Sequence, residues 1–316
     1  MINILISGPN GFVGSNIANY LNQFNYKISG LSRDSEQRNL VLSENFNWDE
    51  LFPLKEFGFN TMIHLAGKAH DLKKTSNEES YFIINTGLTK SLFDVFLQSN
   101  SQTFIYFSSV KAVADEVDGI LTEDVIPDPQ TAYGRSKLKA EEYLLAQKLP
   151  SNRRLIILRP CMIHGPGNKG NLNLLYKIVS KGIPYPLAAY ENRRSFLCID
   201  NLNFLIKEII QNKEIASGIY NIADDESLST NDLVKIISKA SGKNARLWKI
   251  PKKLVVAISK IGDVLHLPLN SERLKKMTEN YLVSNNKIKK ALNINKLPLS
   301  AAEGLEKTIK SFTENR

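Results

Sequence analysis

A tyrosine and a lysine in the middle of the chain have a spacing suited to proton transfer. Tyr133 and Lys137 stand four residues apart in Tyr-Gly-Arg-Ser-Lys, so on a helix their side chains project from one face. A free phenol loses its proton near about pH 10, and a neighbouring ammonium favours the phenolate. The pair could therefore exchange a proton near neutral pH. Many helices carry this spacing without a catalytic role, so its meaning depends on the elements around it.

The N-terminus carries a second chemical pattern. An apolar run at residues 2–6 is followed at once by Gly8-x-x-Gly11-x-x-Gly14, and helical spacing then begins with Ile17. A strand, a glycine turn and a helix form the context of the dinucleotide-binding fingerprint. The glycines let backbone N–H groups and the helix N-terminus approach a pyrophosphate. This order favours cofactor binding over an ordinary turn between a strand and a helix.

The choice between NAD and NADP depends on the end of the next expected strand, residues 26–31. Arg33 at this point suits the 2′-phosphate of NADP, whereas an acidic residue would bind the ribose hydroxyls of NAD. Asp34 follows directly, and Arg33 could equally be an exposed loop residue. Both cofactors stay open, with a mild preference for NADP.

Two further apolar runs, residues 61–66 and 103–107, end in small or polar residues. Gly67 follows the first run and lets the backbone pass close to a cofactor, and Ser108-Ser109 follows the second. Ligands of a parallel sheet gather beyond the carboxyl ends of its strands, so these residues are expected on one side of the sheet. No histidine or acid in a triad-like context accompanies Ser109, which argues against a serine hydrolase.

Composition narrows the class of protein. The chain has 316 residues, 42% of them hydrophobic, and no apolar run long enough to span a membrane, so a cytoplasmic protein is expected. Its formal charge of +9 comes from dispersed lysines without a nucleic-acid motif, which favours small phosphorylated ligands over nucleic acid. Cys161 and Cys198 lie in apolar surroundings and are expected to be buried thiols. His64 lies inside a strand pattern and is expected to be a core residue. Neither it nor the other histidines, His70, His164 and His266, have metal-ligand spacing.

Strands and helices alternate through the first half, which predicts an α/β fold with a doubly wound parallel sheet, a Rossmann domain. The glycine-rich loop at residues 165–170 marks the end of the first lobe. We therefore expect a cofactor-binding domain of residues 1–165 plus about 195–222. The remaining residues, 166–194 and 223–316, would form a smaller C-terminal α/β substrate lobe.

The C-terminal part contains an apolar stripe at helical spacing, from Leu254 through Ile258 and Ile261 to Leu265, flanked by lysines. A helix lying on a membrane surface would have this pattern. Packing inside the substrate lobe is favoured instead, because the stripe is short and Gly262 interrupts it. Ser229-Thr-Asn-Asp232 and Ser300-Ala-Ala-Glu303 each have the form of a helix start.

Several motifs occur in one order along the whole chain: Gly8-x-x-Gly11-x-x-Gly14, His64-Leu-Ala-Gly67, Asn85, Ser108-Ser109, Tyr133-x-x-x-Lys137, Arg159-Pro160 and Arg194-Ser-Phe-x-x-Ile-Asp200. Together they resemble the extended short-chain dehydrogenases/reductases, the NAD-dependent epimerase/dehydratase family acting on nucleotide sugars. Within that family the chain looks most like bacterial 4-epimerases and 4-keto-6-deoxy-sugar reductases of UDP-N-acetylhexosamines in polysaccharide synthesis.

The resemblance implies roles for individual residues. Tyr133 would be the acid and base of a hydride transfer, Lys137 would lower its pKa and bind the nicotinamide ribose, and Ser109 would steady the substrate oxygen. The substrate contacts it implies are Lys111, Asn171 and Arg194, the last two at a diphosphate. The implied contacts to NAD or NADP are Gly8, Gly11, Phe12, Val13, Gly14, Arg33, Leu65, Ala66, Gly67, Asn85, Tyr133, Lys137 and Pro160.

Two departures from the family pattern refine this expectation. Val110-Lys111 stands where the family's 4,6-dehydratases carry an acidic pair, so dehydration is not expected. His164-Gly-Pro166 replaces a Tyr-Gly-Pro of many relatives, and His164 would either meet the substrate or serve a structural role.

The expected function is thus hydride transfer at C4 of a UDP-hexose or UDP-N-acetylhexosamine, with a 4-epimerase favoured and an NADPH-dependent 4-keto reductase as the alternative. A nucleotide-binding scaffold without turnover would not need Ser109, Tyr133 and Lys137 together. A reductase of simple carbonyls would not need Asn171, Arg194 and a long C-terminal lobe. The resemblance also implies a homodimer formed through the helices that carry Asn85 and Tyr133.

Overall fold

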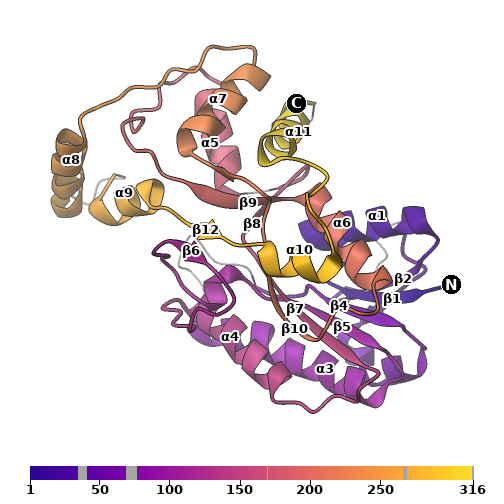
Figure 1. Cartoon of the computed structure of the whole chain (residues 1–316). Helices are drawn as coiled ribbons and strands as arrows, with labels where there is room; N and C mark the ends of the chain where they lie inside the picture. Colours follow the sequence, from indigo (N-terminus) through magenta and orange to yellow (C-terminus); the bar gives the residue numbers. More distant parts are fainter. Residues whose placement is uncertain (35–40, 69–76, 169, 266–268, 315–316) are drawn as a thin grey trace.

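A seven-stranded sheet forms the centre of the molecule (Figure 1). The structure is a computed structural model that describes residues 1–34, 41–68, 77–168, 170–265 and 269–314, without the side chains of 171, 313 and 314. All pairings in this sheet are parallel, and the strand order reverses between β1 and β4. This confirms the predicted doubly wound α/β fold. In sheet order the strands are β10 (Gly218–Ile222), β7 (Arg154–Pro160), β5 (Thr103–Phe107), β4 (Thr61–His64), β1 (Asn3–Ser7), β2 (Lys27–Ser32) and β3 (Glu44–Asn47).

Helices cover both faces of this sheet, which explains why its inner strands β1, β4, β5 and β7 are mostly apolar rather than alternating. Successive side chains of a strand point to opposite faces, so Ile4 and Ile6 join one buried cluster and Leu5 joins the other. Figure 1 shows α1 and α6 on one side of the sheet and α3 and α4 on the other. Their bounds are α1 (Phe12–Leu21), α3 (Leu88–Gln98), α4 (Ala132–Leu145) and α6 (Ile199–Gln211).

Three consecutive helices of two kinds lie between β4 and β5. The α-helix α2 (Glu78–Tyr81) continues into a π-helix, η4 (Phe82–Gly87), before α3 begins. A π-helix inside an α-helix is uncommon and often lies at a functional site. Short 3₁₀ helices connect other elements, and they are η1 (Asn22–Phe24), η2 (Trp48–Glu50), η3 (Phe52–Glu56) and η5 (Val110–Ala112).

The C-terminal elements build a third buried cluster, separate from the two at the sheet. Leu172, Phe196, Val234, Leu274 and Leu305 belong to it. Two small sheets join this region to the rest, one of β11, β9 and β8 and the other of β12 and β6. The bounds are β6 (Ile120–Leu121), β8 (Met162–His164), α5 (Asn171–Val179), β9 (Arg194–Cys198), β11 (Ser227–Leu228), α7 (Thr230–Ala240), α8 (Lys252–Leu265), α9 (Ser271–Thr278), β12 (Leu282–Val283), α10 (Asn286–Leu292) and α11 (Ala301–Glu314).

Helix α8 corrects one sequence-based prediction. The stripe expected to pack inside the lobe is exposed at Leu254, Ile258, Ile261 and Leu265. The buried residues of α8 are instead Val255, Ser259 and Gly262. These small side chains allow a close approach to α9, and a Cβ at residue 262 would overlap the carbonyl oxygen of Leu269. Periodicity located the helix correctly but assigned its buried face wrongly.

Local signals elsewhere were read correctly. Ser229 and Asp232 form a capping box at the start of α7, and the Ser300 and Glu303 side chains exchange hydrogen bonds with each other's backbone N–H before α11. Cys161 and Cys198 are buried free thiols, and burial raises the pKa of Cys198 to about 12. Among the described residues, no helix has the length and apolar character that a membrane span requires.

Candidate active site

The glycine turn after β1 is built for close backbone contact. Gly8 has a φ of +73°, a conformation that L side chains rarely adopt, and a Cβ there would lie 3.1 Å from the backbone nitrogen of Ala66. A Cβ on Gly14 would overlap the carbonyl oxygen of Gly8. Helix α1 starts at Phe12 with no side-chain cap and no acidic residue in its first turn. Its N-terminal N–H groups are therefore suited to an anionic group, as predicted from the fingerprint.

The segment that follows β4, residues 65–67, lies close to both the glycine turn and helix α4. A Cβ on Gly67 would lie 2.9 Å from Oδ1 of Asn85 and 3.3 Å from Nζ of Lys137. Only a residue without a side chain fits between these two groups. The structure thus brings Gly67, Asn85 and Lys137 together, although 70 positions separate the first from the last.

His64 is a core residue, as expected. The N–H groups of Leu65 and Ala66 both donate to Oγ of Ser7 at 3.0 Å, so the Ser7 hydroxyl donates its hydrogen to Nδ1 of His64 at 2.6 Å. The remaining ring hydrogen is then on Nε2, which donates to Oγ1 of Thr89 at 2.9 Å. Burial, and to a smaller extent the nearby Lys137 ammonium, lowers the pKa of His64 to about 3. The neutral ring therefore ties β1 and β4 to α3.

Tyr133 lies in the first turn of α4, beside the end of β5. The Thr131 side chain caps this helix by accepting from the Gly134 N–H at 3.2 Å. A Cβ on Gly134 would overlap the carbonyl oxygen of Lys111, so the helix start packs directly on η5. Burial raises the pKa of the Tyr133 hydroxyl, and the neighbouring Ser109 side chain has a smaller, opposite effect on that pKa. Ser109 and Tyr133 are therefore neighbours, and their catalytic roles stay predictions.

Lys137 is buried one helical turn further on, with only 5% of its surface exposed. Its Nζ donates to the carbonyl oxygen of Phe107 at 2.8 Å and lies 5.0 Å from the centre of the Tyr106 ring. Burial lowers the pKa of Lys137 to about 8, and the nearby Glu141 carboxylate acts in the opposite direction. Burial raises the pKa of Tyr133, and the expected effect of Lys137 on that phenol stays a prediction.

Asn85 connects the π-helix to α4. Its Oδ1 accepts from the Lys68 N–H at 2.7 Å, and its Nδ2 donates to Oγ of Ser136 at 2.9 Å. The Ser136 hydroxyl in turn donates to the carbonyl oxygen of Tyr133 at 2.8 Å. Asn85 is fully buried, and the wider π turn directs its side chain toward α4. It is placed to position the Tyr133 backbone and Lys68.

A buried ion pair beneath the site escaped the sequence analysis. Glu141 follows Lys137 by four residues on the same helix face, and its carboxylate pairs with the Arg159 guanidinium at 2.5 Å. Both side chains are almost fully buried. The Ser108 hydroxyl also donates to Glu141. Glu141 therefore anchors the residue before Ser109, and its i+8 spacing from Tyr133 was the available signal.

We expect Glu141→Gln to destabilise the fold by about 3–5 kcal/mol, because it leaves the Arg159 charge buried without a countercharge. The free energy of unfolding, measured by denaturant titration, checks this. Glu142→Gln, an exposed neighbour on the same helix, is the matched control and should stay within about 0.5 kcal/mol of the parent. Equal stability of the two variants would contradict the role given to the pair.

The expected substrate contacts Lys111 and Arg194 lie in one neighbourhood. Nζ of Lys111 donates to the Asp115 carbonyl at 2.8 Å and stands 4.3 Å from the centre of the Tyr281 ring. Burial lowers the pKa of Lys111, and the Arg194 charge does so as well. The Arg194 guanidinium pairs with Glu279 at 3.2 Å and donates to the Lys276 carbonyl at the end of α9. A ligand binding to Arg194 would compete with these partners.

The remaining predicted residues have simpler positions. Arg33 is exposed just beyond β2, and its carbonyl accepts from Nδ2 of Asn47 at 3.1 Å. Phe12 and Val13 are half-buried in the first turn of α1, and Pro160 is the buried last residue of β7. Asn171 is the first residue of α5, and its side chain lies outside the described part of the chain.

His164 has a structural position. It is fully buried between β8 and α11, where Nδ1 lies 2.9 Å from Oγ1 of Thr308 and Nε2 lies 3.8 Å from the Asp224 carboxylate. Of the two roles left open, the structure therefore favours the structural one. His70 and His266 lie outside the described residues, and the described part contains no cluster of three potential metal ligands.

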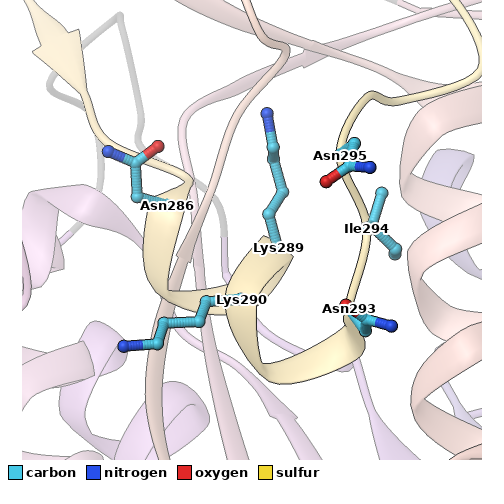
Figure 2. Close-up of a pocket in the computed structure, with 6 residues that line it drawn as sticks. All are labelled: Asn286, Lys289, Lys290, Asn293, Ile294 and Asn295. Atoms are coloured by element: carbon cyan, nitrogen blue, oxygen red, sulfur yellow. The ribbon is translucent and has the colours of Figure 1, made fainter.

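A pocket of about 370 Å³ lies beside α10, away from the residues predicted to bind cofactor or substrate (Figure 2). Figure 2 shows its lining side chains on α10 and on the segment that follows it, among them Lys289 and Asn295. Nζ of Lys289 already pairs with the Asp225 carboxylate at 2.7 Å. None of the predicted site residues lines this pocket.

Comparison with known families decides the class of protein. A model of the NAD-dependent epimerase/dehydratase family matches residues 4–223. The chain belongs to this family. Its membership confirms the predicted resemblance, the predicted nicotinamide cofactor and the predicted kind of enzyme. Which residues contact cofactor and substrate stays a prediction.

Individual relatives are similar over most of their length. The chain is 32% identical over 263 residues to a UDP-glucose 4-epimerase of Vibrio cholerae, covering 78% of each chain. It is 25% identical to the N-acetyl-alpha-D-glucosaminyl-diphospho-ditrans,octacis-undecaprenol 4-epimerase of Escherichia coli O157:H7, covering 97% of this chain and 94% of that one. The solved UDP-glucuronic acid 4-epimerase of Bacillus cereus, in complex with NAD, has a TM-score of 0.77 at 20% identity, covering 99% and 97% of the two chains. The last likeness is one of fold.

Proposed function

We propose that this protein is a 4-epimerase of a UDP-hexose or UDP-N-acetylhexosamine. The observation that carries the proposal is that Ser109 lies beside the Tyr133 hydroxyl, with buried Lys137 one turn away at the carboxyl end of β5. This arrangement suits a proton moved to and from a sugar hydroxyl. The name of the Vibrio cholerae relative, a UDP-glucose 4-epimerase, supports the choice of reaction.

The residues around the glycine turn fit a nicotinamide dinucleotide. Gly8, Gly11 and Gly14 leave backbone and the uncapped start of α1 open to a pyrophosphate, and Gly67 leaves room beside Lys137. When bound, the cofactor supplies a carbon that accepts and returns a hydride. Lys137 and Tyr133 would hold the nicotinamide ribose, and Leu65, Ala66, Asn85 and Pro160 would complete the contacts.

The chain's own part in the reaction is proton transfer and positioning. Tyr133 would take the proton of the C4 hydroxyl and later return it, while Ser109 donates a hydrogen bond to the same oxygen. Lys137 would stabilise the phenolate form of Tyr133, which takes up the proton and forms again when the proton is returned. Asn85 and Glu141 hold the two sides of this arrangement through Ser136 and Ser108. Val110 and Lys111, not an acidic pair, stand directly after Ser109, so dehydration is not proposed.

We further propose that the C-terminal elements form the substrate lobe, with the division at residue 165 predicted from the sequence. The separate buried cluster of these elements supports it. Lys111, Arg194 and Asn171 would bind the diphosphate, since guanidinium and ammonium groups suit phosphate oxygens. Two finer points stay predictions, a homodimer through α3 and α4 and a cytoplasmic location.

A role in surface polysaccharide synthesis is also part of the proposal. The Escherichia coli relative is named for a sugar diphosphate joined to undecaprenol rather than to uridine. Both kinds of substrate carry an N-acetylhexosamine on a diphosphate, the part that Lys111 and Arg194 would contact. A lipid-linked sugar is therefore the second substrate class to test.

The fate of the cofactor tests the reaction. One sample of the purified protein would be denatured to release and identify its bound nucleotide. With the native protein, the absorbance of reduced nicotinamide would be followed during incubation with UDP-N-acetylglucosamine and with UDP-4-keto sugars. Interconversion of the two C4 epimers without net reduction is the expected result. Consumption of one NADPH for each 4-keto sugar, without epimer interconversion, would replace the proposal by a reductase.

One observation favours that reductase as the second candidate. Arg33 is exposed at the end of β2, where a guanidinium can meet a 2′-phosphate. NADPH is the usual reductant that such enzymes consume. An epimerase that retains NAD has no need of this contact, so the cofactor released on denaturation bears directly on the role of Arg33.

A further inference from the structure

Helix α8 presents an apolar surface that the described structure leaves uncovered. Leu254, Ile258, Ile261 and Leu265 follow one another at i, i+4, i+7 and i+11, so they form a single stripe on the helix. Their exposed fractions are 52%, 42%, 55% and 61%. Four large aliphatic side chains aligned in this way are unusual on a surface that meets only water.

The rest of α8 explains why the stripe faces outward. Val255, Ser259 and Gly262 form its buried side, and the Ser259 hydroxyl lies 3.5 Å from that of Ser271 at the start of α9. The Asp263 carboxylate accepts hydrogen bonds from the N–H and hydroxyl of Ser271. These contacts fix the rotation of α8 about its own axis. In Figure 1, α8 lies at the outer end of the C-terminal elements, with α9 between it and the rest of the molecule.

The charges around the stripe indicate what kind of surface it meets. Residues 243–265 contain six basic residues and one acid, Asp263. Lys253 and Lys260 each directly precede a stripe residue, Leu254 and Ile261, so both flank the apolar face. Long lysine side chains can keep their ammonium groups in water while their stems lie along apolar material. A buried protein interface would have to neutralise these charges, whereas anionic headgroups attract them.

We propose that α8 docks on an anionic lipid bilayer, with its aliphatic stripe in the interface and its lysines among the headgroups. The helix then lies in the membrane plane, as amphipathic helices with one apolar face and basic flanks do. Docking would bring the candidate substrate site close to the bilayer. Helix α9 packs on α8, and carbonyl oxygens at its end accept hydrogen bonds from Arg194. Ser271 at the start of α9 contacts α8, and Arg194 meets the other end of this eight-residue helix, so Arg194 would lie within about 20 Å of the headgroups.

This position gives the lipid-linked substrate class a physical basis, and only this link to the substrate rests on the proposed function. A diphosphate attached to a polyprenol lies at headgroup level, where Arg194 could reach it. Docking itself does not require any turnover. It can therefore be tested independently of the reaction.

The test is co-sedimentation with vesicles made of equal parts phosphatidylglycerol and phosphatidylethanolamine. We expect the parent protein to sediment with them, to be released by added salt, and to bind vesicles of phosphatidylcholine alone more weakly. The double variant Ile258→Gln and Ile261→Gln should lose at least about tenfold in partitioning, because two aliphatic side chains leave the interface. Phe52→Gln, an exposed apolar residue in η3 on the other part of the molecule, is the matched control and should bind like the parent.

Other outcomes would overturn the proposal. A parent protein that does not sediment with the anionic vesicles, or a double variant that binds as well as the parent, removes α8 from any role at a membrane. A second copy of the chain is the competing occupant of the stripe. If light scattering shows that the parent is a dimer and the double variant a monomer, and neither protein binds vesicles, the stripe is a subunit interface. Thermal unfolding of each variant would verify that the substitutions at these exposed sites leave the fold intact.

Discussion

Replacing Tyr133 by phenylalanine is expected to reduce turnover by about 10³-fold or more, at the upper end of what a general acid and base contributes. The substitution removes one hydroxyl and keeps the aromatic ring of residue 133, which packs near Tyr81. Binding of cofactor should be preserved, because the glycine turn and Gly67 are untouched. Steady-state rates with a UDP-sugar, together with the stoichiometry of bound cofactor, would measure both effects.

A matched control for this experiment is on the same helix. Tyr143 lies ten residues after Tyr133, and its hydroxyl donates to the Asp94 carboxylate at the protein surface. Tyr143→Phe should therefore leave turnover within about a factor of two, since surface changes away from the site have small effects. Comparable activity of Tyr133→Phe and the parent would rule out the phenol as the acid and base.

Replacing Lys137 by methionine should lower turnover by about 10²-fold or more and reverse its dependence on pH. In the parent, burial lowers the pKa of Lys137 to about 8, so the ammonium is present below this pH and is lost above it. The rate should accordingly fall as pH rises through about 8. Without a cation the Tyr133 phenol, whose pKa burial already raises, ionises only at higher pH. The residual rate of the variant should therefore increase with pH.

Rate profiles from pH about 6.5 to 9.5 would check this reversal. Lys139→Met removes an exposed ammonium from the same helix and should keep the profile of the parent. A Lys137→Met profile that bends downward near the same pH as the parent would assign that titration to another group. Retention of most turnover would show that the ammonium is not needed at Tyr133.

Lysine 137 also affects stability in a defined direction. A folded-state pKa of about 8 is below the value of an exposed lysine, so the folded protein binds fewer protons than the unfolded chain between about pH 8 and 10.5. The free energy of unfolding should consequently rise with pH across this window. The cost of burying the ammonium is present at neutral pH, which is typical of a group retained for function rather than for stability.

Patterns confined to short stretches of sequence were enough to predict the fold and the local elements of the site. Strands of the parallel sheet are covered on both faces, so their residues are continuously apolar and can be recognised without a partner. The glycine turn depends on neighbouring residues, because Gly8 requires a positive φ and Gly14 packs on the carbonyl of Gly8. Tyr133 and Lys137 share a face because helical geometry places residues four apart together.

Features that depend on distant partners were missed or assigned wrongly. Glu141 is an ordinary helix residue in the sequence, and only folding places it against Arg159 and Ser108. No local pattern indicates that Arg194, which stays a predicted diphosphate contact, also meets the end of α9 more than 80 positions later. The π-helix at Asn85 has no recognised local signal, although it directs that side chain toward Ser136.

Helix α8 shows the boundary between the two kinds of information. The sequence by itself determined that residues 252–265 form an amphipathic helix, because that depends on spacing within the segment. Only the tertiary structure decided which side is buried, because α9 offers a surface that accepts Val255, Ser259 and Gly262 at close range. Hydrophobic periodicity specifies an apolar face but contains no description of the surface that must complement it. The close contact between α8 and the start of α9 therefore accommodates the smaller side chains, and the larger aliphatic residues stay exposed.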